Sequence, residues 1–112
     1  MEITVTLSRE IPVYRLSGRL DVLTSPRLEE RLEPLMSGEG RKVVLDCEDL
    51  RYVSSAGLRV FLSVLRHLQS HGGGVALSGL TGQVLELFEL AGLEEMFLIE
   101  PTADLAAARL AV

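Results

Sequence analysis

The 112-residue chain predicts an α/β fold, a single domain over residues 1–112 with a mainly parallel sheet of four to five strands. From residue 25 onward, short apolar runs alternate with segments of helical periodicity, which is typical of parallel strands joined by right-handed crossovers. The chain opens differently, with two strand-like segments in succession, and these predict an antiparallel N-terminal pair. The length suits one domain around one core. We expect about four helices to cover the sheet.

The two opening strands differ in pattern. Residues 2–7 alternate polar and apolar side chains, as in a strand that is buried on one face. Residues 13–16 predict the second strand, which we expect to end at Gly18. Pro12 has no amide proton to donate and therefore belongs at the beginning or the edge of that strand.

The first helix and the third strand come next. Ser25 is the predicted N-cap of this helix, and Pro26 suits the first helical position. Leucines recur at helical spacing to about Met36. Residues 37–40 form a loop of Ser, Gly and Glu. The apolar run at residues 43–45 predicts a strand that is buried on both faces.

The clearest helix covers residues 54–71, and the glycines at 72–74 end it. Its predicted buried stripe consists of Leu58, Phe61, Leu62, Leu65 and Leu68. Residues 75–77 then predict a fourth strand.

The last third of the chain predicts one more helix, a strand and a final helix. Thr81 is the predicted cap of the first of these helices, and Gly92 stops it. Residues 96–99 predict the last strand, and Thr102 caps the helix that follows.

Composition limits the classes of function. The formal net charge is −5 and no basic run occurs, so a broad nucleic-acid surface and direct DNA binding are not expected. The single cysteine, Cys47, permits no internal disulfide and is expected to act as a small hydrophobe. No stretch approaches the roughly 20 apolar residues of a membrane span, and no secretory signal opens the chain. We therefore expect a soluble cytoplasmic protein.

No motif predicts a metal, a cofactor or a catalytic residue. Asp46 and Asp49 lack a third carboxylate at fixed spacing, so turn formation at a strand end is favoured over metal binding. His67 and His71 stand four apart, as in a zinc pair, but no third ligand is in view. The glycines at 72–74 lack the pattern of a nucleotide loop, and no Gly-x-Ser-x-Gly elbow occurs. We do not expect an enzyme.

Polar segments are predicted to meet at the carboxyl ends of the strands, where open α/β sheets bind their partners. These segments are residues 18–21, 46–55 and 78–81. The second of them places Ser54 and Ser55 where the long helix begins. On local pattern alone, Ser55 is interpreted as the N-cap of that helix, although no capping box follows. A glycine such as Gly57 in the first turn of a helix lowers helix stability by roughly 1 kcal/mol relative to Ala. Its presence is explained if another group must approach the backbone closely at this position.

Four segments together resemble the STAS domain, the sulfate transporter and anti-sigma factor antagonist fold. They are residues 16–21, 43–50, 52–58 and 87–93. Their order and spacing cover nearly the whole chain, and the single-domain bacterial anti-sigma factor antagonists are the most similar branch. The resemblance implies a single STAS-like domain.

The resemblance also implies a phosphorylation site. The family's usual motif is Asp-Ser-Ser/Ala-Gly-Leu, in which the serine after the aspartate accepts the phosphate. Aligned on Gly57 and Leu58, that serine is Ser55. Ser54 stands where the family has aspartate and is a rival acceptor.

The partners implied by the resemblance are an ATP-dependent anti-sigma factor serine kinase and a serine phosphatase. Unphosphorylated protein would bind the kinase and free a sigma factor, phosphorylation would end the binding, and the phosphatase would reset the switch. The expected partner-binding residues are Asp21, Thr24, Ser54, Ser55, Gly57 and Arg59. Asp21 fits a solvated turn equally well, and Thr24 is better explained as the residue before a helix cap.

Two other functions stay open on the sequence. The first is a constitutive accessory subunit of a transporter or signalling assembly that is not phosphorylated, and Ser54 in place of aspartate is its support. The second is an enzyme or a nucleotide-binding protein, which nothing in the sequence favours.

Overall fold

In the computed structural model, which describes all 112 residues, the sheet begins with a hairpin. β1 (Glu2–Ser8) and β2 (Ile11–Leu20) are antiparallel, as predicted. Arg9 and Glu10 join them with left-handed backbone, at φ of 54° and 66°. Two such residues form the type I′ turn, whose twist matches that of the flanking strands.

The rest of the sheet is parallel. β3 (Lys42–Val53), β4 (Gly74–Ser78) and β5 (Leu98–Glu100) follow β2 in spatial order, so the sheet reads β1-β2-β3-β4-β5. Each neighbouring pair from β2 onward is parallel. The predicted mainly parallel sheet with an antiparallel opening pair is confirmed.

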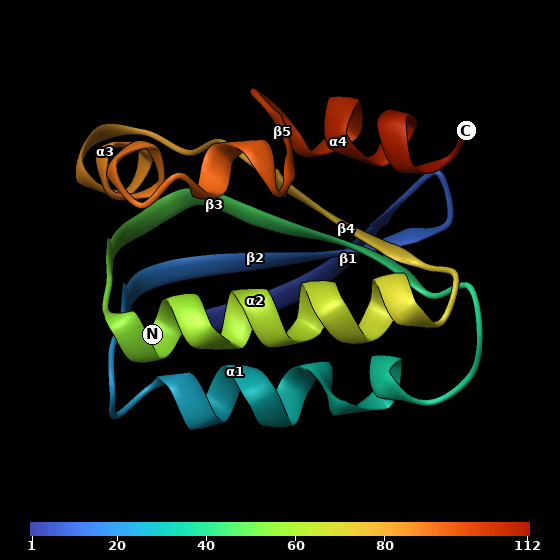
Figure 1. Ribbon diagram of the computed structural model, residues 1–112, viewed down its shortest axis with the longest axis horizontal. Coiled ribbons are helices and arrows are strands. Elements are labelled where there is room, and N and C mark those ends of the chain that lie inside the picture. The colour runs from blue at the N-terminus through green and yellow to red at the C-terminus, as the bar shows by residue number, and fades with distance from the viewer.

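Four α-helices cover the sheet in two layers (Figure 1). α1 (Ser25–Leu32) and α2 (Ser55–Ser70) pack side by side on one face, while α4 (Ala103–Leu110) covers the other. α3 (Gly82–Leu90) packs beside the far end of β3. Short 3₁₀ turns cover Glu33–Met36 and Leu93–Glu95. No helix combines the length and the apolar character that crossing a membrane requires.

The interior divides into two cores, one on each face of the sheet. The larger core joins α1, α2 and α3 to the sheet and contains Phe61, Phe88 and Phe97, with successive ring centroids 6.0 Å apart. The smaller core lies beneath α4, where the fully buried Ala106 and Ala107 face the sheet. Their small side chains allow this helix to lie close to the strands.

Three strand boundaries differ from the sequence prediction. β2 continues through Gly18, whose φ is 101°, so the expectation that the strand ends there is wrong. β3 extends from the predicted residues 43–45 as far as Val53, because its polar second half pairs with β2. β5 begins at Leu98, since Met96 closes the preceding 3₁₀ turn through a hydrogen bond from its amide to the Leu93 carbonyl.

α1 is shorter than predicted. It ends at Leu32, and the chain continues to Met36 as a 3₁₀ turn. Pro34 explains the change, because it has no amide proton with which to continue the α-helical ladder. At the other end of α1, Thr24 occupies the N-cap position and the predicted cap Ser25 is the first helical residue.

The buried stripe of α2 is only partly as predicted. Leu58 and Leu62 are half-buried, whereas Val60 and Val64 are buried. α1 packs against this flank of α2 and rotates the buried face toward the two valines. The prediction is confirmed for Phe61, Leu65 and Leu68.

The two C-terminal helices begin at the predicted threonines. The Thr102 hydroxyl accepts a hydrogen bond from the Leu105 amide at 3.2 Å, which confirms it as a capping residue. Thr81 occupies the N-cap position of α3 but its side chain makes no capping hydrogen bond. Gly92, with a left-handed φ of 70°, follows α3 as predicted.

Candidate functional site

β2 and β3 converge where α2 begins. Leu20 and Val53, the last residues of the two strands, are partners in the parallel ladder. The Ser54 amide then donates to the Leu20 carbonyl at 2.8 Å. The predicted meeting of residues 18–21 with the end of residues 46–55 is therefore confirmed.

The third polar segment, residues 78–81, does not reach this point. β4 ends at Ser78, opposite Asp46, and β3 continues for seven more residues before it ends. Gly79 packs directly against Glu48. The prediction that all three segments meet is wrong because β3 is longer than β4.

The two serines at the start of α2 have different tasks. Ser54 is the N-cap, with extended backbone, and its hydroxyl accepts a hydrogen bond from the Gly57 amide at 3.2 Å. Ser55 is the first helical residue and is exposed. The interpretation of Ser55 as the N-cap is wrong by one position. The hydroxyl that is left free is the one on Ser55.

Gly57 is explained by packing within the chain. It is buried, and a Cβ atom at this position would lie 2.8 Å from Leu20 Cγ and 3.0 Å from the Leu20 carbonyl oxygen. Such distances are below ordinary van der Waals contact. The close approach that this glycine permits is therefore that of α2 to the end of β2, which fixes where Ser55 lies.

Asp21 and Thr24 hold the loop between β2 and α1. Asp21 Oδ1 accepts hydrogen bonds from the amides of Leu23 at 3.0 Å and Thr24 at 3.1 Å. Thr24 Oγ1 accepts one from the Asp21 amide at 2.9 Å and donates one to the Arg19 carbonyl at 2.8 Å. The hydrogen bond from the Thr24 amide lowers the pKa of Asp21. Both side chains thus shape the loop from within.

The loop displays two aliphatic side chains that the sequence analysis missed. Val22 is 69% exposed and Leu23 is 82% exposed. Large exposed aliphatics rimmed by polar residues are typical of interaction surfaces. The sequence feature that could have revealed them is a pair of apolar residues between Asp21 and Thr24. A tight hydrogen-bonded turn at these positions directs the side chains outward.

Two grooves flank the start of α2. One, of about 320 Å³, lies between α1 and α2 and is lined by residues that include Val22 and the exposed Arg59. The other, of about 360 Å³, lies between α2 and α3 and is lined by Ser55, Leu58 and Leu87, among others. Ser55 thus lies at the rim of an apolar groove, with a cationic side chain one helical turn further along.

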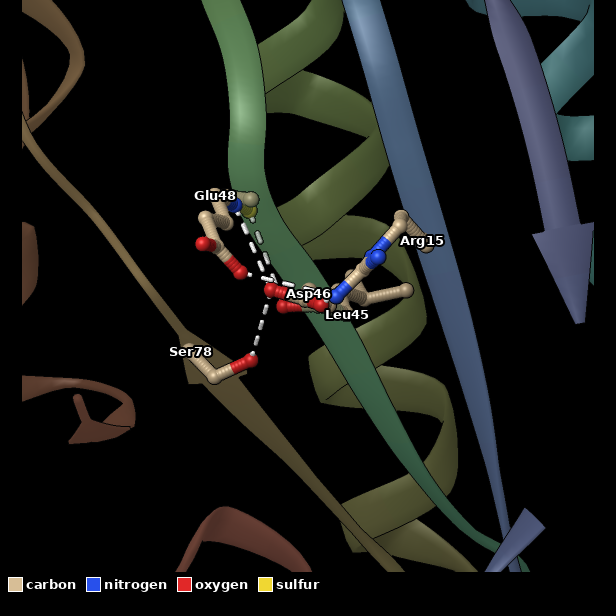
Figure 2. Close-up of polar contacts among 6 residues, drawn as sticks. Arg15, Leu45, Asp46, Glu48 and Ser78 are labelled. Carbon is tan, nitrogen blue, oxygen red and sulfur yellow. Dashed lines mark hydrogen bonds and ion pairs between the residues drawn. The ribbon is translucent and has the colours of Figure 1, made fainter. Parts of the chain in front are cut away.

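A second polar cluster lies on the face of the sheet that α4 covers. Asp46, with a side chain only 4% exposed, accepts from Arg15 Nε at 3.0 Å and from Ser78 Oγ at 3.2 Å. Figure 2 shows Asp46 on β3, between Arg15 of β2 and Ser78 of β4. The hydrogen bond with Asp46 raises the pKa of Arg15. The cluster joins three strands.

The Asp46 cluster also shapes β3. The Glu48 amide donates to Asp46 Oδ1 at 3.2 Å, and the ladder with β2 shifts register just after Arg15. A shift of this kind is a β-bulge, which bends the strand. The interpretation of Asp46 as a turn residue at a strand end is therefore wrong, because it lies inside β3.

The remaining titratable candidates are engaged within the fold. His67 and His71 stack with ring centroids 4.4 Å apart, and each has a ring nitrogen against a backbone carbonyl. Cys47 is fully buried, and desolvation raises the pKa of its thiol. Nowhere do three or more His, Cys, Asp or Glu side chains converge as metal ligands would.

Comparison with known proteins agrees with this architecture. The family model described as the STAS domain matches residues 2–106. The chain belongs to the STAS domain family. The resemblance carried by the four sequence segments is thereby confirmed.

This STAS domain has named relatives. An anti-sigma-B factor antagonist of Staphylococcus aureus (strain NCTC 8325 / PS 47) is 29% identical over 96 residues, which cover 86% of this chain and 89% of the relative. The crystal structure of an anti-sigma factor antagonist from Mycobacterium paratuberculosis has a TM-score of 0.87 at 22% identity and covers 99% of the STAS domain and 94% of that chain.

The fold is also shared with SpoIIAA, an anti-sigma factor antagonist solved in two states. Its unphosphorylated form has a TM-score of 0.80 at 21% identity, over 98% of this STAS domain and 96% of that chain. The phosphorylated form of the Bacillus protein has a TM-score of 0.73 at 20% identity, over 96% of this STAS domain and 98% of that chain.

Proposed function

We propose that this STAS domain is an anti-sigma factor antagonist whose partner binding is switched off by phosphorylation of Ser55. The observation that carries the proposal is the free, exposed hydroxyl of Ser55 at the start of α2, beside a Ser54 hydroxyl that is committed to the helix cap. The relatives with the name anti-sigma-B factor antagonist support the same function.

Chemistry favours Ser55 over Ser54 as the phosphoacceptor. The Ser54 hydroxyl is half-buried and accepts from the Gly57 amide, so a kinase would have to break the helix cap to reach it. Ser55 has no such role. In the transfer, its hydroxyl oxygen takes the γ-phosphoryl group of ATP, ADP leaves, and the partner kinase accepts the hydroxyl proton. The STAS domain is thus a substrate of the kinase.

The surroundings of Ser55 suit a phosphate without unfolding the domain. A phosphoserine carries about −1.5 to −2 charges at pH 7. The first amides of α2 precede the helical ladder and favour an anion, and Arg59 lies one turn along the same face. Arg59 makes no ion pair with another side chain. The phosphate therefore acts on the partner, through repulsion and exclusion at a desolvated contact.

The proposed partner surface combines an apolar loop with this helix start. Val22 and Leu23 supply exposed aliphatic contact, and Asp21 and Thr24 hold them in place. Arg59 adds a cation at the rim. A surface of this kind fits a protein partner, the anti-sigma factor kinase, in the cytoplasm. A serine phosphatase resets the switch, and no DNA contact is needed.

Kinase assays with matched serine variants test the proposal. The protein is incubated with its cognate anti-sigma factor kinase and ATP, and phosphate is located by mass spectrometry of peptides. We expect phosphorylation of wild type and of Ser54→Asn, since asparagine caps a helix without a hydroxyl. Ser55→Ala should remain unmodified. Phosphorylation of Ser55→Ala to the wild-type level would show that the acceptor has been misassigned.

A binding measurement tests the consequence for the partner. Phosphorylated protein and Ser55→Asp should both bind the kinase more weakly than wild type, by at least about tenfold for a single unfavourable charge contact. Both should keep a thermal midpoint close to that of wild type. Equal affinity of the phosphorylated and unphosphorylated forms would contradict the switch.

A further inference from the structure

β1 is an edge strand, and no other strand pairs with its outer side. It pairs only with β2 and has seven residues, none of which is lysine or proline. Natural edge strands are usually protected by such residues, by a bulge or by a covering loop, because open backbone groups can pair with another chain. What this edge binds is a question separate from the switch at Ser55.

The hairpin geometry shows which backbone groups of β1 face outward. In a two-residue hairpin, the flanking residues Ser8 and Ile11 exchange both hydrogen bonds, and hydrogen-bonded pairs then alternate along the ladder. Thr6 and Thr4 therefore bond to β2. The residues between them, Ile3, Val5 and Leu7, turn their amides and carbonyls to the open edge.

Two further observations agree with this assignment. Pro12, which has no amide proton, lies opposite Leu7, in a pair that needs no hydrogen bond. The Ile3 carbonyl accepts a hydrogen bond from Arg31 Nη1 of α1 at 3.4 Å, so it does face away from β2.

The same three residues form an apolar strip, of which Val5 and Leu7 are exposed and Ile3 is half-buried against the larger core. Ile3, Val5 and Leu7 lie opposite Leu16, Tyr14 and Pro12 of β2 and therefore point to the face that α1 and α2 occupy. These helices cover only the Ile3 end of the strip: Val5 is 44% exposed and Leu7 is 73% exposed. Open hydrogen-bonding groups and unburied aliphatic area coincide on β1.

We propose that β1 pairs antiparallel with β1 of a second copy of this chain, about a two-fold axis at Val5. In this register Val5 faces Val5 of the other copy, and Ile3 faces Leu7. All three residues then exchange both backbone hydrogen bonds with the other copy. On one face of the joined sheet, the aliphatic side chains of the two copies contact each other, and on the other face Thr4 lies opposite Thr6. Both kinds of cross-strand pair are favourable.

The choice of occupant rests on this self-complementarity. A shift of the register by one residue would place the outward amide and carbonyl of Val5 opposite the backbone groups of Thr6, which already bond to β2. A shift by two would leave one of the three outward-facing residues without a hydrogen-bonded partner. Glu2, the only charged residue of the strand, lies opposite Ser8, so no like charges meet. The two-fold contact is closed, and it joins the two sheets into one.

Arg31 is compatible with the pairing. It contacts the Ile3 carbonyl from α1 through an exposed hydrogen bond. A carbonyl oxygen has two lone pairs and can accept a second donor, here the Leu7 amide of the other copy.

Charge variants at the two-fold axis test the proposal in the full chain. Sedimentation equilibrium over a range of concentrations should show a dimer for wild type. Val5→Lys and Val5→Glu should each sediment as monomers, because like charges face one another on the axis. An equimolar mixture of the two variants should restore a dimer. A monomeric wild type, or a dimer that both single variants retain, would refute the proposal.

A cysteine pair tests the register independently, including the case in which a charged variant fails to fold. Val5→Cys should oxidise to a covalent dimer, since a hydrogen-bonded pair has Cα atoms about 5.5 Å apart, within the range of a disulfide. Glu2→Cys is the matched control, because its two copies would lie about 20 Å apart along the strands. The native Cys47 is buried and does not compete. Equal crosslinking of both variants, or none of Val5→Cys, would contradict the register.

Discussion

At the start of α2, the backbone of Ser54 is extended and that of Ser55 is helical. This change of conformation between neighbours directs one hydroxyl back to the Gly57 amide and the other into solvent. Gly57 makes the arrangement possible because it lets the helix start rest on Leu20. At the scale of single residues, the site is therefore defined by which serine hydroxyl already accepts a capping hydrogen bond and which does not.

The two serines should differ in their effect on stability. We expect Ser54→Ala to lower the free energy of unfolding by about 1 kcal/mol, since it removes a helix cap. Ser55→Ala should change it by less than about 0.5 kcal/mol, as is usual for an exposed residue without partners. Urea denaturation followed by circular dichroism measures both values. Equal losses for the two variants would contradict the assignment of Ser54 as the cap.

The loop from Asp21 to Thr24 works as one element. The Asp21 carboxylate accepts hydrogen bonds from two backbone amides, and the Thr24 hydroxyl donates one to the Arg19 carbonyl. The turn is therefore closed by its own side chains. The largely exposed aliphatic pair Val22 and Leu23 is held outward by these bonds. Charge on Asp21 therefore maintains the shape of the apolar loop.

This loop should make stability depend on acid pH. Because hydrogen bonding lowers the pKa of Asp21 in the folded chain below its ordinary value of 3.8, the contribution of the carboxylate is complete above that value. It is lost as pH falls through the lower folded value. Asp21→Asn should reduce the fall in unfolding free energy below pH 4, as measured by urea denaturation at several pH values. An unchanged acid slope would contradict a structural role for the carboxylate.

At the scale of the whole molecule, β3 connects the parts. It contributes to both cores, carries Asp46 on the α4 face and leads into Ser54. Cys47 lies in its centre with no exposed surface. Opening of the domain is therefore the route by which solvent reaches this thiol.

Alkylation of Cys47 should report global unfolding. Burial and a raised pKa keep the thiol protonated and inaccessible, so iodoacetamide should react with native protein at least about a thousandfold more slowly than with unfolded chain. Ser54→Ala, being less stable by about 1 kcal/mol, should react about five times faster than wild type when opening and closing are rapid. Fast labelling of native wild type would show that this part of β3 opens locally.

The order and type of the elements could be predicted from the sequence, because helical and strand periodicities alternate clearly. The strand ends were less predictable: Glu48, Asp49 and Arg51 interrupt the apolar pattern of β3, so its polar half resembled a loop. The serines were found as a pair, but a shift of one residue at a helix start leaves no trace in composition. Val22 and Leu23 were missed because their exposure depends on a hydrogen-bonded turn.

The unequal lengths of β3 and β4 have a consequence for the groove beside Ser55. Beyond Asp46, β3 has no strand on one side, and α3 lies there with Val84 and Phe88 buried in the core and Leu85 and Leu87 partly buried against it. Gln83, which is exposed, and Leu87 line the groove that Ser55 also lines. Substitution of the exposed Gln83 would therefore change this groove while the sheet stays intact.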